Sequence, residues 1–142
     1  MFANQYAAYE TLSPGLRALA DSLHANYYRD ANMGRLLGGL HGAVKTATHP
    51  VVRTHPITGR RALYLTPDPT VRLEGFSEAE SRAIVALFAA HATQPALCYR
   101  HRWQPGDVLM WDNRCTLHYA VHDYGEAERV LYRTTICGDV PQ

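Results

Sequence analysis

Apolar positions repeat at helical spacing in two stretches of the chain. The first begins at Ser13 and Pro14, which place a capping residue before a proline at the first helical position. Leucines then recur every three or four residues, at Leu12, Leu16, Leu19 and Leu23. This pattern predicts a helix from about Pro14 to Asn26.

The second helical stretch has a clearer start. Ser77 and Glu80 have the spacing of a capping box, in which each side chain accepts from the backbone N–H of the other residue. One face then carries Ile84, Leu87, Phe88 and His91. The helix is expected to end near residues 93–95. We expect both helices to lie on the surface and to pack their apolar faces on a core, and not to offer grooves to a partner.

Short runs of β-forming residues separated by turn residues make up most of the remaining chain. Runs at 50–54 and 61–66, joined by a turn at 56–59, predict a hairpin. Further strands are predicted at 97–103, 108–111, 117–121 and 129–136, with a turn at 104–107. Residues 28–48 contain Gly34, Gly38, Gly39 and Gly42 and predict a long loop or a mobile flap.

These elements predict one domain over residues 1–142, built as an antiparallel sandwich or barrel decorated by two helices. The formal charge of +1 gives no electrostatic footprint for nucleic acid or an acidic membrane. Absence of a long apolar run or a leader pattern favours a cytoplasmic protein. Cys98, Cys115 and Cys137 fit neither a disulfide framework nor a Cys-x-x-Cys zinc site, and we expect buried thiols.

The candidate chemistry lies in the last third of the chain. In a strand, Arg129, Leu131, Arg133 and Thr135 would share one face. If that face lines an interior, its two guanidinium groups need anionic partners, and a dicarboxylate matches the arginine fork. An outer, solvated face or ordinary ion pairs explain the same spacing. For His49, His55 and His91, turn or packing roles are favoured over metal binding.

Three segments carry a family resemblance: residues 48–64, residues 102–114, and His118-Tyr119-Ala120 followed by Arg129. They resemble the taurine dioxygenase and 2,4-dichlorophenoxyacetate dioxygenase family, whose members depend on iron(II) and 2-oxoglutarate. The resemblance covers nearly the whole chain. It implies a mainly β fold with surface helices, a partial double-stranded β-helix of the jelly-roll, cupin-like kind.

The resemblance also implies roles for single residues. His118 matches the distal histidine of the family's two-histidine, one-carboxylate iron site. Arg129 matches the arginine that pairs with 2-oxoglutarate, and Arg133 an arginine that holds the anionic group of the substrate. Residues 111–113, Trp-Asp-Asn, match a family signature, and we expect them to contact the residues that bind the metal and not the metal itself.

One part of the family pattern is missing. No histidine in the chain is followed two residues later by Asp or Glu, so the His-x-Asp motif that supplies the other two iron ligands is absent. We therefore expect the chain to correspond to the C-terminal portion of such an enzyme. A single imidazole should bind iron weakly. Exposed strand edges should favour association between copies.

Two functions remain open on this basis. The first is a dioxygenase that converts 2-oxoglutarate to succinate while hydroxylating a small anionic organic substrate such as a sulfonate; this chain alone is expected to be inactive. The second is a non-catalytic remnant that binds an oxoacid, or that needs a partner to complete its metal site. A zinc hydrolase would need three clustered protein ligands, of which the sequence supports only one.

Overall fold

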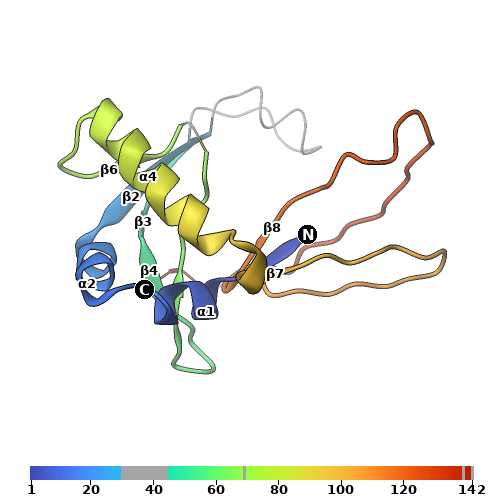
Figure 1. Cartoon of the computed structure of the whole chain (residues 1–142), viewed down its shortest axis with the longest axis horizontal. Helices are drawn as coiled ribbons and strands as arrows, with labels where there is room; N and C mark the ends of the chain where they lie inside the picture. Colours follow the sequence, from blue (N-terminus) through green and yellow to red (C-terminus); the bar gives the residue numbers. More distant parts are fainter. Residues whose placement is uncertain (30–44, 69, 139, 142) are drawn as a thin grey trace.

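A computed structural model describes residues 1–29, 45–68, 70–138 and 140–141 (Figure 1). Its helices are α1 (Gln5–Glu10), α2 (Pro14–Ser22), α4 (Glu78–Ala92) and the short 3-10 helix η1 (Pro95–Leu97). Its strands are β1 (Phe2–Asn4), β2 (His24–Arg29), β3 (Lys45–Pro50), β4 (Val52–Thr54), β5 (Arg61–Leu63), β6 (Arg72–Leu73), β7 (Cys98–Tyr99) and β8 (Thr116–His118). No helix among these residues is long and apolar enough to cross a bilayer.

The strands form three small antiparallel sheets, with orders β7-β1-β8, β3-β2-β6 and β4-β5. Helix α4 lies across the body of the molecule, against β6 and α1, while α1 packs on β5 (Figure 1). Their apolar side chains meet in one core, made of Ala8, Tyr9, Leu12, Ala20, Leu23, Ala25, Val51, Val52, Leu63, Leu65, Val71, Leu73, Val85, Phe88 and Ala92. The core therefore lies within residues 8–92, and the last third of the chain lies outside it.

The predicted second helix and the hairpin are confirmed. Ser77 accepts from the Glu80 amide while the Glu80 carboxylate accepts from the Ser77 amide, so the capping box is present and α4 ends at Ala92. The buried face of α4 differs from the predicted one, because Val85 and Phe88 are buried whereas Leu87 is exposed. Strands β4 and β5 pair around the predicted turn.

The first helix is shorter than predicted. It begins at Pro14 behind the Ser13 cap but ends at Ser22, because Leu23 is extended and β2 follows. The leucine repeat therefore runs one residue past the helix, to the C-cap Leu23. Tyr28 and residues 45–48 also lie in strands β2 and β3, so the predicted loop is wrong at both ends. Its middle, residues 30–44, lies outside the described residues.

The predicted strands of the last third are largely wrong. Among the described residues of this third, only Cys98–Tyr99 and Thr116–His118 are strands, whereas residues 108–111 and 129–136 are not. Two long arms leave the body here, residues 100–115 and residues 119–138 (Figure 1). A strand requires a hydrogen-bonded neighbour, and within the described ranges no strand pairs with either arm.

Candidate active site and comparison with known proteins

The Trp111 indole is the centre of the candidate site. The His118 imidazole lies with its centroid 5.2 Å from the Trp111 ring, and the Phe2 ring lies 5.1 Å away from the same indole. The guanidinium carbon of Arg133 stands 5.6 Å from the indole centroid, within reach of a cation–π contact. Strand pairing explains part of this arrangement, because Phe2 in β1 faces His118 in β8.

The electrostatics of this group favour a neutral imidazole. His118 lies on the exposed end of β8, but partial desolvation by its neighbours lowers its pKa below the ordinary value, and the positive charge of Arg133 lowers this pKa further. A neutral imidazole has a free lone pair and can bind a metal without first losing a proton. The pair of His118 and Arg133 therefore offers a ligand atom beside a cation that suits an anionic group.

Arg129 lies on the same arm as Arg133, residues 119–138, but contacts a different aromatic ring. Its guanidinium carbon stands 5.4 Å from the ring centroid of Tyr124, and the segment 129–136 is exposed and forms no strand. The predicted common strand face of Arg129, Leu131, Arg133 and Thr135 is therefore wrong for this structure.

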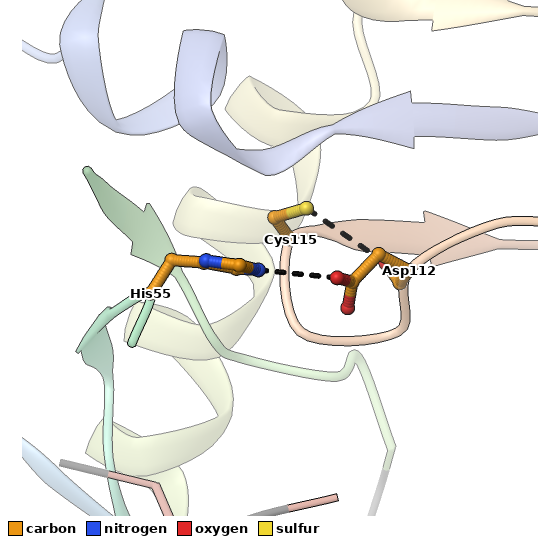
Figure 2. A group of neighbouring side chains, drawn as sticks. All are labelled: His55, Asp112 and Cys115. Carbon is orange, nitrogen blue, oxygen red and sulfur yellow. Dashed lines mark hydrogen bonds and ion pairs between the residues drawn. The ribbon is translucent and has the colours of Figure 1, made fainter. Parts of the chain in front are cut away.

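A second cluster joins distant parts of the chain. His55, after β4, faces Asp112 and Cys115 in the loop before β8 (Figure 2). The His55 Nε2 atom lies 3.1 Å from Asp112 Oδ2, and one ligand atom from each of the three residues lies within 4.8 Å of the others. The hydrogen bonds of Arg114 hold the pKa of the Asp112 carboxyl well below its usual range, with a further contribution from His55.

The predicted structural roles of His55 and His91 are confirmed, whereas the prediction for the cysteines is wrong. His55 takes the predicted turn role, because its Nδ1 accepts from the Ile57 and Thr58 amides. His91 Nε2 lies 2.9 Å from the Ala8 carbonyl oxygen and ties α4 to α1. The expectation of buried thiols is wrong, since Cys98 and Cys115 are half-buried and Cys137 is exposed.

The ligand set at His118 is incomplete within the described residues. There, one group of three His, Cys, Asp or Glu side chains comes close enough to hold a metal, and it is the His55 cluster, without His118. A facial iron site needs two histidines and a carboxylate. The described residues therefore do not fit a complete iron site around His118.

A family model described as "Taurine catabolism dioxygenase TauD, TfdA family" matches residues 1–135. The chain belongs to the TauD, TfdA family. The chain spans about half the length of the curated relatives it matches. One of these TauD, TfdA relatives is an alpha-ketoglutarate-dependent sulfate ester dioxygenase from Pseudomonas putida; it is 42% identical, over 99% of this chain and 50% of its own. Alpha-ketoglutarate is another name for 2-oxoglutarate.

Solved structures agree. A taurine dioxygenase from Burkholderia xenovorans is 36% identical with a TM-score of 0.69, over 81% of this chain and 37% of its own. AAD-2 in complex with Mn(II) and N-oxalylglycine is 32% identical with a TM-score of 0.68, over 81% of this chain and 47% of its own. These likenesses confirm the predicted class for this TauD, TfdA chain, a mainly β jelly roll with surface helices.

Trp111, His118 and Arg133 were predicted from the sequence as site residues, whereas the contact between His55 and Asp112 was not predicted. The signal available in the sequence was weak, because His55 precedes Pro56 and is typical of a turn. Nothing in the local pattern indicates a partner 57 residues away.

Proposed function

We propose that this chain is the part of a 2-oxoglutarate-dependent dioxygenase that supplies the last histidine ligand, His118, together with two anion-binding arginines. Arg129 would hold the distal carboxylate of 2-oxoglutarate, and Arg133 the anionic group of a small organic substrate. Bound iron(II) would supply oxygen activation. The described residues do not complete the iron site, so the other two ligands would have to come from outside them.

One observation carries this proposal: His118 and Arg133 meet at the same indole, although they lie on different segments. The proposal is supported further by the relatives. One is named a sulfate ester dioxygenase, and another is named an alkylsulfatase. Sulfate esters and sulfonates carry a compact anionic oxygen group, to which the planar guanidinium donates two parallel hydrogen bonds.

A second function is favoured by the incomplete ligand set, namely binding of an oxoacid without turnover, or turnover only with a partner that supplies the other ligands. Isothermal titration of the chain with 2-oxoglutarate, first without metal and then with iron(II) under nitrogen, separates the two. Binding that requires both iron(II) and His118 supports the dioxygenase. Binding that requires Arg129 but is indifferent to metal supports the oxoacid binder.

The matched variants are Arg129→Ala and Arg102→Ala, because Arg102 is an exposed arginine on the other arm. The first should lose 2-oxoglutarate binding and the second should retain it. Succinate release with iron(II), ascorbate and oxygen is measured in parallel against His118→Ala. Equal 2-oxoglutarate affinity for both arginine variants would refute the assignment of Arg129.

A further inference from the structure

We propose that His55, Asp112 and Arg114 form a positioning clamp that fixes the loop before β8 and, through Trp111, orients the imidazole of His118. The purpose of the clamp rests on the proposed function, since the orientation of His118 matters for a ligand atom. The contacts that define the clamp do not depend on it.

The hydrogen bonds of His55 define its tautomer. The backbone amides of Ile57 and Thr58 lie 3.3 Å and 3.2 Å from Nδ1, and an amide N–H can only donate. Nδ1 must therefore be the acceptor, which leaves the proton on Nε2. This N–H then donates to Asp112 Oδ2 over 3.1 Å. His55 is only 4% exposed, so water cannot easily replace these partners.

Asp112 is held from its other side by Arg114. Oδ1 accepts from the Arg114 backbone amide at 2.8 Å and from Nε at 2.9 Å, while Oδ2 accepts from Nη2 at 2.7 Å. Side-chain and main-chain donors of one residue thus grip one carboxylate, the geometry in which arginine is most specific. The His55 bond connects this grip to the β4–β5 turn.

The clamp lies next to Trp111 and just before the strand that carries His118. Asp112 is adjacent to Trp111, and its carbonyl oxygen accepts from the Cys115 amide at 3.4 Å, just before β8 begins at Thr116. The Cys115 carbonyl oxygen accepts from the Gln5 amide at 3.0 Å, so this loop is also tied to α1. Holding Asp112 therefore sets both the indole and the start of the strand that carries His118.

A metal site is the alternative reading of His55, Asp112 and Cys115, and two features oppose it. A metal would need the lone pair of His55 Nε2, but Nε2 carries the ring proton because Nδ1 accepts from two amides. A metal-binding histidine has the opposite arrangement, since the nitrogen that does not bind the metal donates a hydrogen bond. Both Asp112 oxygens are also occupied by Arg114. The arrangement in Figure 2 thus fits a hydrogen-bonded clamp better than a cation site.

Two substitutions of His55 separate the clamp from the turn. In His55→Asn the amide oxygen replaces Nδ1, so the turn is retained and the bond to Asp112 is lost. In His55→Gln the amide nitrogen replaces the Nε2–H donor, so the bond to Asp112 is retained and the turn cap is lost. Asp112→Asn is a third variant that removes the charge paired with Arg114.

The readout is the NMR spectrum of the whole metal-free chain. In the wild type, ¹⁵N chemical shifts should report the Nε2–H tautomer of His55. The chemical shifts of the His118 ring protons should be displaced by the ring current of the neighbouring Trp111 indole. His55→Asn and Asp112→Asn should lose that displacement, whereas His55→Gln should keep it. Phe88 resonances show whether each variant is folded, and Asp112→Asn decides if neither His55 variant folds.

Two results would overturn the clamp. One is an unchanged His118 spectrum in the folded His55→Asn or Asp112→Asn variant, or an equal loss in His55→Gln. The other is stoichiometric Zn²⁺ binding that moves the His55 resonances and is abolished in Cys115→Ser, which would make the cluster a metal site. Neither measurement uses 2-oxoglutarate or turnover, so the clamp and the proposed function can fail separately.

Discussion

The body of the molecule and its two C-terminal arms use the same kinds of residue with opposite results. In the body, Leu63 is 2% exposed and Phe88 is 1% exposed. In the arms, Val108 is 95% exposed and Tyr132 is 98% exposed. Alternation of apolar and polar residues decides which side chains share a face, but burial needs a second layer of structure. Within the described residues, the arms lack that layer.

The strongest test of this contrast is a large-to-small substitution in the core. Phe88→Ala should lower the free energy of unfolding by about 3–5 kcal/mol, because it removes buried surface and leaves a cavity between α4 and the sheets. Urea denaturation followed by circular dichroism measures the change. A loss below about 1 kcal/mol would mean that the core is not packed as described.

A smaller loss is expected at the start of α4. Ser77→Ala removes the side-chain acceptor of the Glu80 amide and should cost about 1 kcal/mol of stability. Ser77→Asp restores an acceptor and should recover most of that loss. Thermal denaturation of the three proteins under one condition provides the comparison, and equal midpoints for the alanine and aspartate variants would contradict the cap.

The junction between body and arms should be sensitive to acid. Because the folded-state pKa of Asp112 lies below the unfolded value of about 3.9, the carboxylate stabilises the fold above that pH and loses its effect as pH falls through the folded pKa. The stability gap between wild type and Asp112→Asn should thus be largest above about pH 4 and shrink on acidification. Urea midpoints at several pH values measure it; a gap independent of pH would exclude this linkage.

The smallest effect is expected in the arms. Val108→Ser should change the free energy of unfolding by less than about 0.5 kcal/mol, since its side chain loses no burial. The same denaturation assay as for Phe88→Ala makes the comparison direct. A loss as large as that of a core residue would show that this arm is covered by another layer in solution.

The sequence was sufficient wherever a short-range signal fixed the structure. The Ser77 and Glu80 spacing predicted α4, and the turn residues between β4 and β5 predicted their pairing. It was insufficient for α2, where Leu23 continued a helical repeat although its backbone is extended. It also failed for residues 129–136, because strand formation there depends on partners that the local pattern does not contain.

The site shows the same division. The resemblance pointed to His118 and Arg133, and the structure brings both to Trp111. The bond from His55 to Asp112 was not predicted, because it depends on how the hairpin turn packs against a loop far along the chain. Long-range contacts of this kind follow from the tertiary fold and not from spacing.

Strand β1 has a consequence for the order of folding. It is the middle strand of its sheet, and both of its neighbours, β7 and β8, lie roughly a hundred residues later. Closing so long a loop is entropically costly, so this sheet should form after the local hairpin and helices. On the ribosome, at about 5–20 residues per second, Phe2 would wait on the order of ten seconds for His118 to be made. The sheet that carries His118, the proposed ligand, is therefore among the last parts of the chain to form.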